Sequence, residues 1–98
     1  MPKFIFTYHA PDGYQLGEPD AVAAWQDWFK SMGEHLDNIG NPVLERRTVG
    51  NAGDATQLDG FSLIEADDLE AATVLAKGCP FVGQDGGVTV GQLAELPD

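Results

Sequence analysis

The spacing between hydrophobic positions changes along this chain, and each type of spacing predicts a strand, a helix or a loop. Phe4, Phe6 and Tyr8 alternate with Ile5, Thr7 and His9, and we predict that residues 3–9 form a largely apolar strand that is covered on both faces. Glycine and proline are frequent in residues 10–18, which predicts a loop. We therefore expect the chain to begin with a buried strand and a loop that leads into a helix.

An apolar stripe with steps of three and four residues predicts a long helix over residues 19–39. Pro19 suits the first turn of that helix, because a backbone N–H at this position would have no partner within the helix. Gly40 and Pro42 are expected to end it. The stripe consists of Val22, Trp25, Phe29, Met32, Leu36 and Ile39.

The second half of the chain predicts two further strands before a second helix. Residues 42–49 place valine and leucine around two arginines and predict a strand, and residues 51–57 predict a turn. Residues 60–66 predict the next strand, since they form a compact apolar run that starts at a glycine. We expect these two strands to form a hairpin with a long loop.

An acidic turn and an alanine-rich helix follow, and a last strand closes the fold. Asp67 and Asp68 are placed where their side chains can cap a helix over residues 69–76, which a Gly-Cys-Pro sequence ends. Residues 88–96 predict the last strand, and Gly91 within it suggests a bulge or bend.

The resulting order, β-α-β-β-α-β, predicts an α+β fold of the ferredoxin-like type, with two helices on one face of an antiparallel sheet. A chain of 98 residues suits a single domain, residues 1–98. The helices leave one face of the sheet bare, and the strand pattern makes that face partly apolar. We therefore expect a homodimer in which this face packs against a second copy.

Composition restricts the classes of partner. The formal net charge of -11 repels phosphate backbones and anionic membranes, so nucleic-acid binding is not expected. No apolar stretch approaches the roughly 20 residues of a membrane span. Cys79 is the single cysteine, which rules out a disulfide within one chain and a cysteine-based metal site. These features favour a cytoplasmic protein with no metal and no cofactor.

Two histidines and two arginines are the candidates for acid–base chemistry or anion binding. His9 stands at the end of the first strand and titrates near neutrality, so it is the candidate catalytic base. His35 is expected to face solvent. Arg46 and Arg47 are neighbours in a predicted strand, so one of them should point inward, where it could bind a ligand oxyanion or pair with an acidic residue such as Glu45.

Three further residues are candidates for a ligand pocket. Tyr8 lies beside His9, and Trp28 stands off the apolar stripe of its helix, so it is predicted to line a pocket or an interface. Trp25 is assigned to the core because it belongs to the stripe. Cys79 would be a nucleophile only if its thiolate were stabilised, and the alternative is a small buried side chain.

Three segments resemble the YCII-related family of the dimeric α+β barrel superfamily. They are the first strand, the sequence WQDWFKSMGEHLDNIGNPV at 25–43 and the sequence GFSLIEADDLEAATVLAKGCPFVGQDGGVTV at 60–90. The resemblance implies a homodimeric barrel in which two sheets face each other. Some members carry a His on the first helix and an Asp before the proline that follows the second helix, a pair suggested to serve acid–base chemistry. Trp28 and Cys79 stand at those two positions here, and neither side chain replaces its counterpart in proton transfer.

Three hypotheses about function follow. The first is binding of a small aromatic or anionic metabolite in a pocket between the sheet and the helices, lined by candidates Tyr8, Trp28, Arg46, Arg47 and Cys79. A second is a lyase-like acid–base enzyme that uses His9, with Tyr8 or an arginine as electrophilic support. A third is a purely structural or interaction module.

Overall fold

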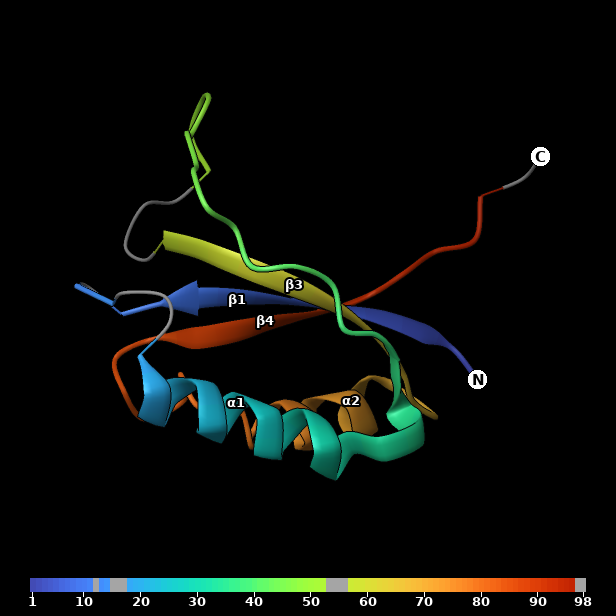
Figure 1. Ribbon diagram of the computed structural model, residues 1–98. Coiled ribbons are helices and arrows are strands. Elements are labelled where there is room, and N and C mark those ends of the chain that lie inside the picture. The colour runs from blue at the N-terminus through green and yellow to red at the C-terminus, as the bar shows by residue number, and fades with distance from the viewer. Residues whose placement is uncertain (12, 15–17, 53–56, 97–98) are drawn as a thin grey trace.

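A single antiparallel sheet carries both helices on one of its faces, as the computed structural model of the chain shows (Figure 1). The structure describes residues 1–11, 13–14, 18–52 and 57–96. The predicted α+β, ferredoxin-like arrangement is confirmed. Within the described ranges the elements are β1 (Lys3–Ala10), α1 (Pro19–Met32), a 3₁₀ turn (Gly33–His35), β2 (Leu36–Asn38), β3 (Gln57–Glu65), α2 (Leu69–Ala76) and β4 (Gly87–Gln92).

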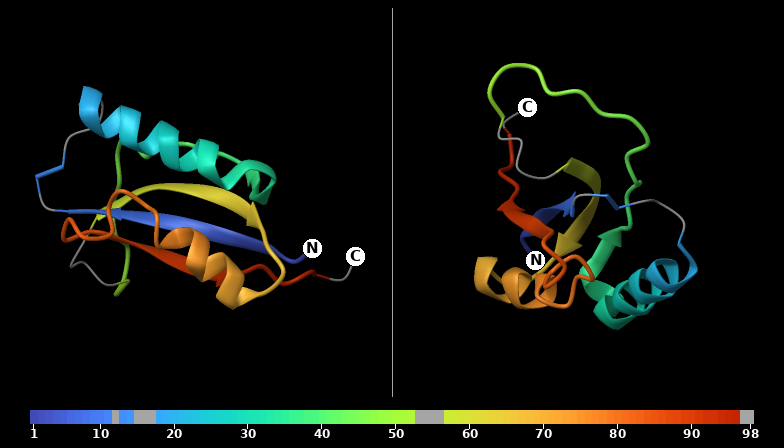
Figure 2. Two further views of the ribbon diagram at one scale, coloured as in Figure 1. Left: turned by 90° about the horizontal axis from the view of Figure 1, so that it is seen from below. Right: turned by 90° about the vertical axis from the view of Figure 1, so that its left-hand side faces the viewer.

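The strands are arranged in the order β2-β3-β1-β4, and each is antiparallel to its neighbours. In the middle of the sheet Phe6 of β1 pairs with Ser62 of β3 on one side and with Val90 of β4 on the other. Because side chains alternate along a strand, these three residues share the face that carries the helices. Both α1 and α2 lie across that face when the molecule is seen from below (Figure 2, left).

The hydrophobic core lies between the sheet and the helices. Phe6 stacks on Trp28 of α1, with ring centroids 6.1 Å apart and an interplanar angle of 12°. Burial of such aromatic side chains is the largest contribution that a core of this size can make. The other large core side chains are Phe4, Tyr8, Met32, Ile64 and Phe81.

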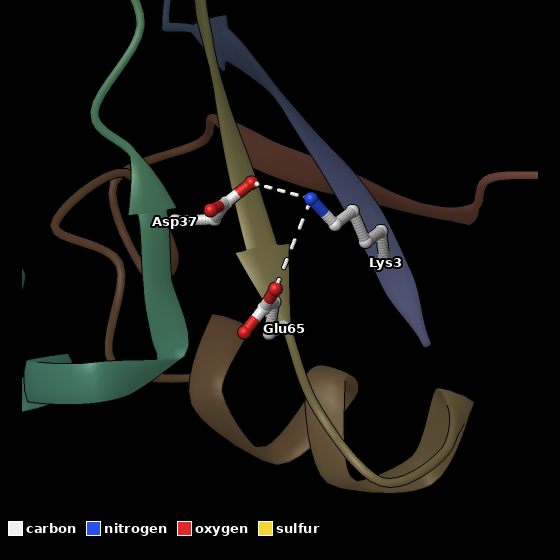
Figure 3. Close-up of polar contacts among 3 residues, drawn as sticks. All are labelled: Lys3, Asp37 and Glu65. Carbon is white, nitrogen blue, oxygen red and sulfur yellow. Dashed lines mark hydrogen bonds and ion pairs between the residues drawn. The ribbon is translucent and has the colours of Figure 1, made fainter. Parts of the chain in front are cut away.

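The face of the sheet opposite the helices, here called the open face, is covered by no helix or strand in the described part of the chain (Figure 2, right). Ile5, Leu63 and Thr89 are among the side chains on it, as the register of β1 with its two neighbours requires. Lys3 lies at one end, within 3.4 Å of Asp37 and 3.8 Å of Glu65, and so links three strands (Figure 3).

The first helix ends earlier than the apolar stripe predicts. α1 stops at Met32 because Gly33 takes φ 55°, a conformation that a helix cannot continue, and the N–H of Gly33 bonds to the carbonyl of Lys30. The predicted helix over 19–39 is therefore wrong in its last seven residues. Leu36, which was assigned to the helix stripe, lies in β2 opposite Ile64.

The second strand also lies elsewhere than predicted. Residues 42–49 were expected to form it, but β2 is Leu36–Asn38, and the later segment contributes only one isolated bridge, between Pro42 and Gly60, in the described residues. Pro42 has no N–H to donate to a ladder, and the arginines that follow are exposed. The segment beyond Pro42 leaves the sheet on the side away from the helices (Figure 1).

The second helix and its cap agree with the sequence prediction. α2 spans Leu69–Ala76, and the Asp68 carboxylate accepts a 2.8 Å hydrogen bond from the N–H of Ala71. The last strand, β4, is shorter than the predicted 88–96, and Gly91 pairs with Ile5 without a shift of register.

The predicted loop at 10–18 and turn at 51–57 lie partly outside the described residues, at positions 12, 15–17 and 53–56. In the described part of the chain no helix is long and apolar enough to cross a membrane.

Candidate functional site

A cavity of about 260 Å³ opens between α1 and the β3 side of the sheet. Its most prominent walls are the rings of Tyr8 from β1 and of Trp25 and Phe29 from α1, so we call it the aromatic cavity. The segment that follows β2, residues 39–42, closes one side. The volume suits a ligand with one ring and a short side arm.

Helical spacing brings the α1 part of the wall together. Val22, Trp25 and Phe29 are separated by three and four residues, so they project from the same face of the helix. The ring of Trp25 lies 4.8 Å from that of Tyr8 in an edge-to-face contact and 5.6 Å from that of Phe29. This mutual packing fixes the rings before any ligand arrives.

Two glycines allow the segment after β2 to approach β3 closely. Gly40 has φ 74°, and a Cβ at this residue would overlap the carbonyl oxygen of Phe61. At Gly60 a Cβ would lie 2.9 Å from the carbonyl oxygen of Asn41. Backbone can pack against backbone here only without side chains, and this contact forms the floor of the aromatic cavity.

Asp59 is the acidic residue of the aromatic cavity, and an irregularity in β3 places it there. Tyr8 pairs with Gly60 and the next residue, His9, pairs with Leu58, so Asp59 is the extra residue of a bulge. A bulge changes the direction in which a side chain points, and Asp59 belongs to the cavity lining. The residue as a whole has 9% of its surface exposed.

The electrostatic surroundings of Asp59 are unusual for a carboxylate. Burial raises the pKa of its carboxyl above the ordinary value, and the positive charge of Arg46 opposes this shift. No described residue donates a hydrogen bond to the carboxylate, and none forms an ion pair with it at 4 Å or less. Burial and the nearby charge of Asp59 together raise the pKa of Tyr14, which also lines the cavity.

The hydroxyl of Tyr8 is engaged in a structural chain of hydrogen bonds. It donates to Oγ of Ser62 at 2.8 Å, and Ser62 in turn donates to the carbonyl of Ile39 at 2.6 Å. Burial raises the pKa of Tyr8, so the phenol stays protonated at neutral pH. Tyr8 therefore contributes its ring to the cavity lining, while its hydroxyl holds β1, β3 and the segment after β2 together.

The two tryptophans of α1 exchange the roles expected from the stripe. Trp25 lines the aromatic cavity, whereas Trp28 is 6% exposed in the core and lies outside the cavity lining. Trp28 and Met32 are the buried residues of α1, and Trp25 is partly buried, packed against the core from the cavity side. Trp28 instead fills the space between Phe6 and Gly78.

Cys79 also lies in the core, with 2% of its surface exposed, and outside the cavity lining. Burial raises the pKa of its thiol to about 11, although the backbone N–H groups of Phe81 and Val82 partly offset the shift. A protonated, buried thiol is a packing element, not an activated nucleophile.

The arginines lie on the outside of the molecule. Since residues 42–49 do not form a strand, the expectation that Arg46 and Arg47 point to opposite faces of a sheet does not apply, and both are exposed. The guanidinium of Arg46 donates to the carbonyls of Leu58 at 2.7 Å and Val43 at 3.1 Å. Arg46 thus fastens the segment after Pro42 to the start of β3.

His9 lies on the open face, across the sheet from the aromatic cavity. Its Nε2 is 3.2 Å from the hydroxyl oxygens of both Thr7 and Thr89. Among the described residues no carboxylate or arginine is hydrogen-bonded to its ring. We therefore do not propose His9 as a base for a ligand in the aromatic cavity.

The structure also separates His9 from His35. Nδ1 of His35 is hydrogen-bonded at 2.9 Å to the carbonyl of Glu65, so this side chain is half-buried and not turned to solvent. Within the described residues no three His, Cys, Asp or Glu side chains converge in a way that could hold a metal ion.

The arrangement of the strands and helices agrees with a known domain family. The family model of the YCII-related domain matches residues 4–96, which is nearly the whole chain. The chain belongs to the YCII-related domain family. No curated protein matches this YCII-related chain.

A solved structure of similar fold is a 5-chloro-2-hydroxyhydroquinone dehydrochlorinase from Burkholderia phenoliruptrix AC1100, in complex with 2,5-dihydroxybenzoquinone. It is 17% identical to the YCII-related chain, and the match covers 94% of this chain and 93% of the dehydrochlorinase, with a TM-score of 0.66. At this identity the likeness shows a shared fold.

Of the cavity residues, only Tyr8 was among the candidates from the sequence. Trp25 was assigned to the core, and Asp59 and Tyr14 were not selected. A usable signal was present at Asp59, because an aspartate at the start of an apolar strand, directly before glycine, marks a place where a ladder can bulge. Nothing local in the sequence indicates that this bulge faces α1.

Proposed function

We propose that this YCII-related chain binds a small aromatic molecule in the aromatic cavity. The observation that carries the proposal is the preformed wall of three packed rings, Tyr8, Trp25 and Phe29, around a space of about 260 Å³. Apolar cavities with a few polar groups are the usual form of small-molecule sites. An aromatic ligand can stack on or contact these rings edge to face without further rearrangement.

The aromatic class is favoured over the anionic class by the charges around the cavity. Arg46 and Arg47, the two arginines considered for anion binding, are exposed and do not line it. The acidic side chain of Asp59 does, and a ligand anion would be repelled by it. The ligand of the dehydrochlorinase, 2,5-dihydroxybenzoquinone, is a single six-membered ring, which supports a search among one-ring compounds such as phenols and hydroquinones.

Thermal-shift measurements with a panel of one-ring phenols and hydroquinones test this proposal. A ligand that binds the folded chain raises its melting temperature in proportion to the logarithm of ligand concentration. Val22→Trp places an indole at the mouth of the cavity, where Val22 is 41% exposed, and should abolish the shift.

Val74→Trp is the matched control, because Val74 is also an exposed valine in a helix, α2, and does not line the cavity. This variant should keep the shift. The proposal is contradicted if no compound stabilises the wild-type chain, or if both variants respond to ligand as the wild type does.

We also propose that the open face packs against a second copy of the chain. The face carries Ile5 and Leu63 side by side, with no described element over them. Residues 43–52 and 93–96 both leave the sheet toward this side (Figure 2, right), and they expose Leu44, Val49 and Leu96. Two apolar arms beside a bare sheet face suit a partner of the same shape, related by a twofold axis.

Size-exclusion chromatography with light scattering tests the assembly. The wild-type chain should elute with about twice its mass of 10.5 kDa. Leu63→Lys places a charge in the middle of the open face and should give a folded monomer, whereas Val74→Lys on α2 should leave the dimer intact. A wild-type monomer at micromolar concentration contradicts this proposal.

A further inference from the structure

We propose that the aromatic cavity selects ligands that carry a protonated amine, which the carboxylate of Asp59 binds while the aromatic rings surround it. This inference rests on the proposed function, because it specifies the chemistry of a ligand in the same cavity. It commits to a cationic group attached to a small apolar or aromatic body.

The first support is that the Asp59 side chain lines the cavity and makes no hydrogen bond or ion pair with a described residue. The residue as a whole is 9% exposed, but its oxygens are not among the buried side-chain atoms that lack a partner. A ligand ammonium group can therefore replace water at this carboxylate and form a charge-assisted hydrogen bond with it. The bulge between Gly60 and Leu58 places Asp59 in the cavity lining, where a ligand can be that partner.

Arg46, whose positive charge acts on Asp59, forms no ion pair with it among the described contacts. Arg46 acts on Asp59 through its charge, but its three hydrogen bonds go to the carbonyls of Leu58 and Val43 and to the side chain of Gln57. With every nitrogen of the guanidinium donating elsewhere, Arg46 holds the backbone beside the site and leaves the cavity side of the carboxylate to a ligand.

The second support is the chemistry of the surrounding walls. Tyr8, Trp25 and Phe29 present aromatic rings, whose negative faces attract cations, and Tyr14 adds a fourth ring next to Asp59. Aromatic rings combined with a single carboxylate form the kind of site that recognises ammonium groups in water-poor surroundings. The same walls have no described cationic side chain that could neutralise a ligand carboxylate.

The net charge of the whole chain also favours a cationic ligand. A formal net charge of -11 creates a negative potential that concentrates cations near the surface and raises their rate of association. Anionic ligands are repelled both at long range and by Asp59 at short range. The size of the cavity, about 260 Å³, limits the ligand to roughly one ring and a short amine arm.

Isothermal titration calorimetry at neutral pH and low salt tests the inference with three probes that share a phenethyl body and differ in the charge of the attached group. Phenethylamine is a cation, phenethyl alcohol is neutral and hydrocinnamate is an anion. We expect the amine to bind at least about tenfold more tightly than the alcohol, and the anion to bind most weakly. Asp59→Asn, which keeps the shape of the side chain, should remove most of the preference for the amine.

Asp67→Asn is the matched control, because it removes the same charge from an exposed turn away from the cavity and should keep the preference. The inference is overturned if the alcohol or the anion binds the wild-type chain as tightly as the amine, or if the preference survives in Asp59→Asn. If phenols bind and the amine does not, the cavity keeps its proposed function and the amine inference falls. If neither the three probes nor the phenol panel binds, the proposed function itself fails.

Discussion

The indole Nε1 of Trp28 donates a 3.1 Å hydrogen bond to the backbone carbonyl of Leu75, and this bond ties α1 to the last turn of α2. The ring lies so close to Gly78 that a Cβ there would be 2.9 Å from Nε1. The Leu75 carbonyl is near the end of α2 and also accepts a 3.3 Å hydrogen bond from the N–H of Gly78. The Trp28 side chain therefore adds a second bond at this helix end and holds the two helices together.

Replacing Trp28 should destabilise the fold much more than replacing Trp25. Trp28→Phe removes the bond to Leu75 and leaves a gap beside Gly78, so we expect a loss of about 2 kcal/mol in the free energy of unfolding. Trp25→Phe changes a half-buried wall of the aromatic cavity and should cost less than about 1 kcal/mol. Urea unfolding measures both values, and equal losses would contradict the assignment.

Gly40 and Gly50 form a matched pair that tests the close contact between the backbone at Gly40 and the backbone of Phe61. Both have φ 74°, but only at Gly40 would a Cβ overlap the carbonyl of Phe61, whereas nothing lies within 4 Å at Gly50. Gly50→Ala should cost about 1 kcal/mol from backbone conformation alone. Gly40→Ala should cost several times more and should also disrupt the aromatic cavity. Similar melting temperatures for the two variants would show that the contact is not as close as described.

Asp59 should make stability depend on pH in a particular direction. Burial raises the pKa of its carboxyl above the ordinary value of 3.8, so the folded chain binds this proton more readily than the unfolded chain does. Stability then falls as pH rises through the window above 3.8, and the full cost is present above the pKa of the folded state. Without ligand, Asp59→Asn should melt a few degrees above the wild type at neutral pH.

That difference should shrink as the pH falls toward 3.8, because the wild-type carboxyl then becomes neutral as well. Arg46 reduces the difference by its charge, and Tyr14 does not, because its phenol is neutral in this range. Melting curves across the acidic range, with Asp67→Asn as the control for net charge, measure it. A variant that is less stable than the wild type at neutral pH would contradict this reading of Asp59.

The thiol of Cys79 should react slowly in the folded chain. Burial raises its pKa to about 11 from an ordinary value of 9.0, which lowers the thiolate fraction at neutral pH by roughly a hundredfold. Alkylation by iodoacetamide, followed by mass spectrometry, should therefore be at least that much slower in the native chain than in urea. Rapid modification of the native chain would indicate an activated and accessible cysteine.

The segment from Asp68 to Ala76 shows what local sequence signals can predict about the structure. The capping aspartate, the alanine-rich apolar spacing and the glycine that follows are all local signals, and together they placed α2 at its observed bounds. β1 was predicted in the same way from residues 3–9, since its alternation is unbroken. The order of the elements and the antiparallel sheet followed from these local patterns.

Local sequence signals did not determine where α1 ends or where the second strand lies. The apolar stripe continues through Leu36 and Ile39, so the sequence favoured a longer helix, but pairing of Leu36 with Ile64 makes that residue part of the sheet. Because Gly33 ends the helix, the backbone of Leu36 needs other partners, and pairing with β3 supplies them while the side chain packs against the core. The packing of α1 on the sheet likewise places Trp28 in the core and Trp25 in the cavity wall, which the apolar stripe did not indicate.

What the sequence determined by itself was the fold class, the second helix and the first strand, because these depend on contacts between near neighbours. Only the tertiary structure decided the site. Asp59 lines the aromatic cavity because β3 bulges against β1, and it shares that lining with Trp25 only because α1 crosses this part of the sheet. A register between distant strands and the packing of a helix across them have no counterpart in the order of residues along the chain.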